Sequence, residues 1–306
     1  MRGALGLVRE IEKVIVGKRD VIEKVLMTVL AGGHILLEDI PGVGKTTLAL
    51  ALSQALDLRC RRVQFTPDVM PSDIGGFSIF NKKTGAMEYQ PGPIFCNLFL
   101  ADEINRASSR TQAALLEAME EGRVTVDGET RELPAPFVVI ATQNPAGSAG
   151  TQLLPNSQLD RFMIRLSLGY PAHEDEIELL RRKQALEEAA QVAQVASREA
   201  VLALRRKAGE VFVKEEMLDY IVRLVGATRK SADIRQGASP RASLALMKLA
   251  QAGALLRGRD YILPEDVAAV FVDANVHRLI LEPRAGRTAE AVLEQILASV
   301  PAPRIR

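Results

Sequence analysis

The stretch Glu38-Asp39-Ile40-Pro41-Gly42-Val43-Gly44-Lys45-Thr46-Thr47 carries the strongest structural signal in this sequence. The apolar run Ile35-Leu36-Leu37 precedes it, and the pattern that follows it from Leu48 is helical. A strand, a glycine-rich turn and a helix in this order form the setting of a phosphate-binding loop. In such a loop, backbone N–H groups and the positive end of the helix dipole face the phosphates. The stretch therefore predicts a site for a triphosphate.

Single residues of this loop have separate tasks. Gly42 and Gly44 let the backbone approach the phosphates because they carry no Cβ. Lys45 adds a positive charge, and the hydroxyl of Thr46 can ligate Mg²⁺. Asp39 departs from the usual pattern, which has its first glycine at this position. The alternative is a strand–turn–helix corner that carries Gly-Lys-Thr by chance, and the motifs described below weigh against it.

Size and composition are those of an ordinary globular protein. The chain has 306 residues, of which 47% are hydrophobic and 25% charged, and this length suits roughly two domains. The net charge of +1 gives no overall attraction to nucleic acid or anionic membranes. Cys60 and Cys96 are too few for a disulfide framework or a metal site. The start of the chain lacks the apolar core of a signal peptide, and no membrane span is expected, so we predict a soluble, cytoplasmic protein.

Strand-like and helical segments alternate up to about Pro171. The expected strands are short apolar runs of the kind found in a parallel sheet covered on both faces. They lie at His34–Glu38, Arg62–Thr66, Leu98–Asp102, Phe137–Thr142 and Met163–Leu168. The predicted fold class is therefore α/β, with a five-stranded parallel sheet between two helical layers over residues 1–171. From Ala172 the pattern is helical throughout, which predicts a helical linker and an all-α domain over 172–306.

Two segments interrupt this alternation. Residues 67–93 are rich in proline and glycine and include a possible hairpin across Asn81–Gly85. A second hairpin is expected over residues 123–133, turned at Asp127-Gly128. Both are predicted to project from one side of the sheet. They are either loop decoration or parts that contact a substrate or partner, and the residues leave this open.

Polar residues end two of the predicted strands. Leu98-Phe99-Leu100-Ala101 leads into Asp102 and Glu103, at the edge where open α/β sheets bind ligands. Asp102 could hold Mg²⁺, and Glu103 could orient and deprotonate an attacking water. The strand that ends near Thr142 is followed by Asn144, which could bond that water or the γ-phosphate. An acidic turn and a turn asparagine are the simpler interpretations.

Two arginines could complete such a site. Arg161 lies in Leu159-Asp160-Arg161-Phe162, and Arg241 lies in Ser239-Pro240-Arg241-Ala242, near a predicted helix start. A guanidinium group beside a γ-phosphate can raise the rate of phosphoryl transfer by about 10³–10⁵. A lone arginine is more often part of a surface ion pair, so spacing alone does not assign either residue.

The order of these motifs resembles the MoxR family of AAA+ ATPases. The likeness rests on Gly-Val-Gly-Lys-Thr, Leu-Ala-Asp-Glu-Ile-Asn-Arg, Ala-Thr-Gln-Asn-Pro, Leu-Asp-Arg-Phe and Ser-Pro-Arg-Ala, and runs from about Val14 to Ala298. It implies an AAA+ core followed by a lid, with ATP and Mg²⁺ as ligands. The implied nucleotide-binding residues are Val16, Gly17, Pro41, Gly42, Val43, Gly44, Lys45, Thr46 and Thr47. The implied catalytic residues are Lys45, Glu103, Asn144 (sensor 1), Arg161 (arginine finger) and Arg241 (sensor 2), with Thr46 and Asp102 at the metal. Asp39 resembles the Glu-Asp-Val-Pro-Gly form of this family.

The resemblance also implies how the protein works. Arg161 is expected to reach a neighbour's nucleotide rather than its own, so hydrolysis would require a ring, expected to be a hexamer. Arg241 would move the lid when the γ-phosphate is lost. The expected function is chaperone-like: ATP turnover remodels or matures a client protein complex, or inserts metal into it, beside a partner with a von Willebrand factor A domain.

Two other functions are open at this point. A nucleic-acid motor could use the basic clusters Arg59-Arg61-Arg62, Arg181-Arg182-Lys183 and Arg205-Arg206-Lys207. Acidic residues interleave the helical clusters, and aromatic residues make up only 4% of the chain, so platforms for stacking bases are scarce. A nucleotide-dependent scaffold with little turnover is the other alternative, and the Asp102-Glu103 pair argues against it.

Overall fold

The computed structural model describes residues 2–144, 154–184 and 191–304. Its centre is a five-stranded parallel sheet in the order β2-β5-β8-β1-β9. These strands are β1 (Ile35–Glu38), β2 (Cys60–Gln64), β5 (Leu98–Asp102), β8 (Val138–Gln143) and β9 (Ile164–Leu166). The α/β class and the parallel sheet are as predicted, and β2 begins two residues earlier than expected because Cys60 pairs with Leu98 of β5.

The residues of the central strands alternate between two apolar cores. Ile35 and Leu37 belong to a core with the N-terminal helices, whereas Leu36 between them belongs to a core with the helix that follows β5. This alternation is the period of two that a strand imposes. The helices of the α/β part are α1 (Arg2–Glu12), α2 (Arg19–Ala31), α3 (Lys45–Ala55), η1 (Ile104–Arg106), α5 (Ser109–Glu121) and α6 (Asn156–Leu159). Helices therefore cover both faces of the sheet.

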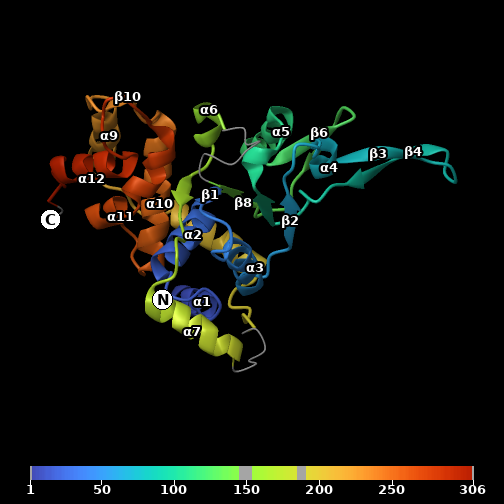
Figure 1. Ribbon diagram of the computed structural model, residues 1–306, viewed down its shortest axis with the longest axis horizontal. Helices are drawn as coiled ribbons and strands as arrows, with labels where there is room; N and C mark the ends of the chain where they lie inside the picture. The colour runs from blue at the N-terminus through green and yellow to red at the C-terminus, as the bar shows by residue number, and fades with distance from the viewer. Residues whose placement is uncertain (1, 145–153, 185–190, 305–306) are drawn as a thin grey trace.

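Both predicted insertions are present. The first contains α4 (Pro71–Gly75) and an antiparallel hairpin of β3 (Gly76–Asn81) and β4 (Ala86–Pro91). The second is the hairpin of β6 (Arg123–Val126) and β7 (Glu129–Glu132). The first hairpin projects from the end of the molecule opposite the C-terminal helices (Figure 1). Its exposed side chains include Phe77, Ile79, Phe80 and Met87, so it presents apolar surface away from the core.

The C-terminal part is mainly helical. It comprises α7 (His173–Gln184), α8 (Arg198–Gly209), α9 (Glu215–Thr228), α10 (Pro240–Leu256), α11 (Pro264–Asn275), η2 (Val276–Arg278) and α12 (Ala289–Ser299). The expectation of helices throughout was wrong in one respect, since β10 (Ile234–Gln236) pairs with β11 (Ile280–Leu281). Buried residues of α2, α8 and α10 belong to one apolar core, so the helical part packs firmly on the α/β part. Within the described residues, no helix is both long and apolar enough to cross a bilayer.

The imidazole of His34 joins the start of β1 to two other elements. Its Nδ1 accepts a hydrogen bond of 2.9 Å from Val139 N, and its Nε2 donates one of 3.0 Å to Met119 O. Burial lowers the pKa of His34 to about 4. The neutral ring is therefore the form that the folded protein holds at neutral pH.

We expect the free energy of unfolding to fall by about 2 kcal/mol between pH 7 and pH 5 on account of His34. In this range the unfolded chain takes up a proton at the imidazole and the folded protein does not, so acidification favours unfolding. Denaturant titrations at both pH values, on the native chain and a His34→Asn variant, measure this loss. The variant should show the smaller pH dependence, and His173→Asn, at an exposed position, should behave like the native chain. Equal pH dependence in the native chain and His34→Asn would contradict the assignment.

Candidate functional site

The phosphate loop lies between β1 and α3, as the sequence predicts. Gly42 and Gly44 have φ angles of 89° and 96°, a region that an L side chain rarely adopts. Gly44 is the N-cap of α3, so the first turn of this helix opens toward the loop. Lys45 is buried, and its Nζ donates to Asp39 O at 2.8 Å and to Ile40 O at 3.3 Å. The loop is thus curled around the amine that is expected to meet the phosphates.

The contacts of Asp39 explain why an aspartate stands where the usual pattern has a glycine. Its Oδ1 accepts hydrogen bonds from Ser167 Oγ at 2.7 Å and Gly169 N at 3.0 Å, and its Oδ2 accepts one from Leu168 N at 2.6 Å. These three residues connect β9 to α7, so the carboxylate ties the phosphate loop to the start of the C-terminal helices. A glycine at this position would have no side chain to make these bonds.

The acidic pair lies at the carboxyl end of β5. Thr142 Oγ1 donates to Asp102 Oδ1 at 2.6 Å, and the guanidinium of Arg62 donates to Asp102 Oδ2 at 2.7 and 3.2 Å. Glu103 has a φ of 56°, and its backbone N–H donates to Thr142 Oγ1 at 2.9 Å. The Glu103 side chain has other partners, Arg106 and Asn144. The two carboxylates are therefore held in different environments although they are adjacent in sequence.

The guanidinium of Arg106 and the side-chain amide of Asn144 lie beside Glu103. Arg106 Nη1 contacts its Oε2 at 3.0 Å, and Asn144 Nδ2 approaches its Oε1 at 3.4 Å. Asn144 follows β8, which is the neighbour of β5 in the sheet. The predicted proximity of Asn144 and the acidic pair is therefore present in the structure.

One cleft of about 380 Å³ brings most of the predicted residues together. Its lining consists of Pro41, Gly42, Gly44, Lys45, Thr46, Thr47, Arg62, Gln64, Asp102, Glu103 and Asn144. Burial lowers the pKa of Lys45, and the carboxylates of Asp39, Asp102 and Glu103 oppose this effect. These carboxylates favour the charged form of the amine, which is the form that attracts a phosphate. Val43 does not line the cleft.

Arg62 and Gln64 are cleft residues that the sequence analysis missed. The sequence places Arg62 only in a basic cluster that favours the nucleic-acid alternative. Both residues lie on β2, where Gln64 pairs in register with Asp102. The available signal was their spacing of two, which places both side chains on the same face of a strand beside the acidic pair.

The segment Val16-Gly17-Lys18 lies outside the lining of this cleft but next to its loop. A Cβ at Gly44 would stand 3.8 Å from Cδ1 of Ile15, the residue directly before this segment, so the chain approaches the phosphate loop closely here. A Cβ at Gly17 would collide with the carboxylate of Asp175 on α7, and Lys18 Nζ donates to Tyr170 O at 2.7 Å. The segment is thus enclosed between the phosphate loop and the start of α7, where a base attached to the phosphates could lie.

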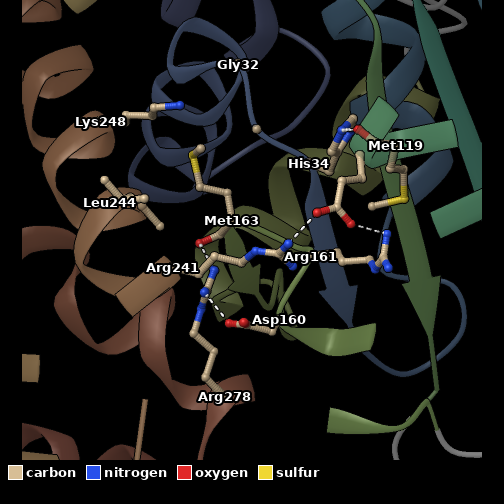
Figure 2. Close-up of a pocket in the computed structure, with 13 residues that line it drawn as sticks. Gly32, His34, Met119, Asp160, Arg161, Met163, Arg241, Leu244, Lys248 and Arg278 are labelled. Atoms are coloured by element: carbon tan, nitrogen blue, oxygen red, sulfur yellow. Dashed lines mark hydrogen bonds and ion pairs between the residues drawn. The ribbon is translucent and has the colours of Figure 1, made fainter. Parts of the chain in front are cut away.

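The two predicted arginines lie in a different cavity. Arg161 and Arg241 line one cavity of about 230 Å³ between α5 and α10, and neither lines the cleft of the phosphate loop (Figure 2). Both guanidinium groups form ion pairs with the carboxylate of Glu120, near the end of α5. Arg161 Nη1 also donates to Leu116 O at 2.9 Å. The structure therefore places the two arginines together and away from their own phosphate loop.

The donor set of the cleft fits Mg²⁺ held mainly through a nucleotide. Thr46 and Asp102 both line the cleft, and hydroxyl and carboxylate oxygens are ligands that Mg²⁺ accepts. In the described part of the chain, no group of three or more His, Cys, Asp and Glu residues could hold a metal ion by itself. Such a sparse protein donor set is typical of a metal whose remaining ligands are phosphate oxygens and water.

Comparisons with known proteins agree over nearly the whole chain. The model of the ATPase family associated with various cellular activities (AAA) matches residues 34–164, and that of an AAA lid domain matches residues 226–296. YeaC of Bacillus subtilis is 46% identical over 97% of this chain and 93% of its own length. The chaperone MoxR1 of Mycobacterium tuberculosis is 39% identical over 97% of this chain and 81% of its own. A crystal structure of a protein from Cytophaga hutchinsonii superposes with a TM-score of 0.92 at 39% identity, covering 99% and 96% of the two chains.

Proposed function

The chain belongs to the MoxR family of AAA ATPases, and from this membership we propose that it works as a chaperone-like ring that remodels client protein complexes. Nucleotide binding and ATP hydrolysis follow from the family itself. The observation that carries the proposal is the cleft in which Lys45, Asp102 and Glu103 face one space. The chemistry of that space is phosphoryl transfer to water.

The positions of the main cleft residues indicate their proposed roles. Lys45 and the loop N–H groups bind the phosphates, and Thr46 with Asp102 would hold Mg²⁺, which neutralises phosphate charge when bound. Glu103 orients the attacking water and accepts its proton. Asn144 lies within reach of Glu103 and of the same space, so it can hold the water or the γ-phosphate. The enclosed position beside Val16-Gly17 is proposed for the adenine.

The positions of Arg161 and Arg241 support a site that is shared between protomers. Neither residue lines its own phosphate cleft, and the two lie together on one cavity. A guanidinium group contributes to phosphoryl transfer only where it reaches the phosphate. We therefore assign both arginines to the nucleotide of an adjoining protomer. AAA ATPases are typically oligomeric. In a closed ring of identical contacts, proposed to be a hexamer, every cleft receives the arginines of a neighbouring protomer.

The client is proposed to contact the two hairpins. The hairpin of β3 and β4 carries exposed apolar side chains at a distance from the core, and such surface is typical of a protein interaction site. The relative MoxR1 is named a chaperone, which supports this assignment. A partner with a von Willebrand factor A domain and a metal-insertion task are further parts of the proposal.

The basic clusters support this function over a nucleic-acid motor. Arg62 is engaged with Asp102 in the cleft. Arg205 is mainly buried, which lowers its pKa to about 10, and its Nε donates to Val29 O at 2.8 Å. Arg182 pairs with Glu178 on its own helix at 2.9 Å. One guanidinium group of each basic cluster therefore serves a contact within the protein, which reduces the positive charge that a nucleic acid could meet.

We expect a Glu103→Gln variant to form rings with ATP and to retain clients on them. Without the base, ATP persists and so does the nucleotide-bound assembly. Light scattering with and without ATP measures the assembly, and a pulldown from the source cell identifies the client. Lys45→Ala serves as the matched control, because it should neither bind ATP nor assemble. A Glu103→Gln chain that stays monomeric with saturating ATP at tens of micromolar protein would overturn the ring.

A further inference from the structure

Glu120 holds two functional arginines at once. Its Oε2 pairs with Arg161 Nη1, and its Oε1 pairs with Arg241 Nη2. Arg161 lies between α6 and β9 of the α/β part, whereas Arg241 lies in the first turn of α10. Figure 2 shows the two guanidinium groups directed to the same place in the cavity. A single carboxylate therefore connects the α/β part with the helical part.

The cavity keeps positive charge even with this carboxylate in place. Asp160 Oδ1 pairs with Arg278 Nη1 at 2.6 Å, which balances that buried guanidinium. The remaining charged groups that line the cavity are Arg161, Arg241, Lys248 and Glu120. Three cations thus line the cavity with one carboxylate, and Arg161 and Arg241 pair with that carboxylate, whose side chain is 37% exposed. Guanidinium groups bind phosphate as well as carboxylate oxygens, so an incoming oxyanion can compete with Glu120 for the two arginines.

We propose that Glu120 is a latch that occupies Arg161 and Arg241 in the separate protomer and releases them to the neighbour's triphosphate. The inference rests on the shared site proposed above. The N–H groups that bond Glu120 are the groups that a γ-phosphate would need, so the carboxylate and the phosphate compete for them. A triphosphate carries more negative charge than one carboxylate, and the two anions repel each other at short distance. Binding of the neighbour's nucleotide therefore displaces Glu120.

Contacts near Glu120 keep Arg161 and Arg241 close to their positions after the carboxylate is displaced. Arg161 keeps its bond to Leu116 O on the same helix, so it stays near its place after release. Arg241 N donates to Ser239 Oγ at 3.1 Å, and that hydroxyl donates to Asp160 at 3.0 Å, so the start of α10 also remains attached. The hairpin of β6 and β7 begins at Arg123, directly after the glycine that ends α5. A client that moves this hairpin can therefore move the latch.

The test compares ATP turnover over a range of protein concentrations for the native chain, Glu120→Gln and Glu121→Gln. Glutamine keeps the shape of the side chain and removes its charge, so the arginines of the variant are free before assembly. Glu120→Gln should reach half-maximal turnover at a concentration about three to ten times lower, the scale expected for the loss of partly exposed ion pairs. Glu121 pairs with Arg123 on the surface, so Glu121→Gln should match the native chain. Melting temperatures of all three proteins check the fold.

The Arg161→Ala substitution, alone and combined with Glu120→Gln, completes the test of the latch. Adding Arg161→Ala to Glu120→Gln should abolish the gain, because the released finger is the source of the added activity. Turnover of Glu120→Gln that is equal to or lower than native at every concentration would overturn the latch, and so would a gain that survives without Arg161. If Arg161→Ala alone leaves native turnover unchanged, the shared site itself fails. If Arg161→Ala alone abolishes turnover and Glu120→Gln behaves as native, only the latch fails.

Discussion

Replacing Glu103 with glutamine is expected to lower ATP turnover by about 10²–10⁴ while ATP still binds. Glu103 directly follows β5 and has a backbone φ of 56°. Its side chain lines the cleft beside Asn144. Glutamine keeps the size of the group and its contact with Asn144, but it cannot accept the proton of the attacking water. Phosphate release under saturating ATP measures turnover, and a fluorescent nucleotide measures binding.

A matched control separates this effect from a general loss of charge. Glu210 is exposed at the C-terminal end of α8, so Glu210→Gln should have native turnover. If Glu103→Gln retained more than about a tenth of native turnover, the proton-accepting role would be wrong. The protein would then be closer to the scaffold alternative, in which the nucleotide is bound and slowly turned over.

Replacing Arg161 with alanine is expected to lower turnover by about 10³–10⁵ when rings are formed. The guanidinium group neutralises charge that develops on the phosphate, and no other described side chain holds the same position against Leu116 O. Binding of ATP to the variant's own cleft should be unchanged, because Arg161 does not line that cleft. Measuring both turnover and ATP affinity therefore distinguishes an effect on a neighbour's nucleotide from an effect on the variant's own.

Arg181→Ala is the control for this variant, since Arg181 is exposed on α7 and has only a 4.0 Å contact with Glu178. It should have native turnover and assembly. An Arg161→Ala chain that binds ATP more weakly, with unchanged turnover at saturation, would show that Arg161 acts on its own nucleotide and not on a neighbour's.

The local elements of this fold were largely predictable from the chain. The phosphate loop, the acidic pair and the turn at Asp127-Gly128 depend on residues that are adjacent in sequence. The glycine conformations at 42 and 44 and the two-sided apolar strands are likewise local properties. Because the carboxyl ends of parallel strands lie at one edge of the sheet, the meeting of Lys45 with Asp102 and Glu103 also followed.

The missed features depend on distant contacts. The strands β10 and β11 have three and two residues, too few for a recognisable period, and they form only because Ile234 meets Leu281. Arg62 resembles any other basic residue until β2 is placed beside β5. The pairing of Glu120 with Arg241 joins α5 to α10 across the molecule, and no local pattern in either helix predicts it.

The central claim is that a cleft of one protomer is completed by Arg161 of the next, and mixing two inactive variants tests it most directly. Glu103→Gln keeps the arginine and lacks the base, whereas Arg161→Ala keeps the base and lacks the arginine. In a randomly mixed ring at equal amounts, roughly a quarter of the interfaces join an intact base to an intact arginine, so turnover should recover to roughly that fraction of native. A mixture that shows no more activity than the two variants measured separately, at concentrations where rings form, would contradict the claim.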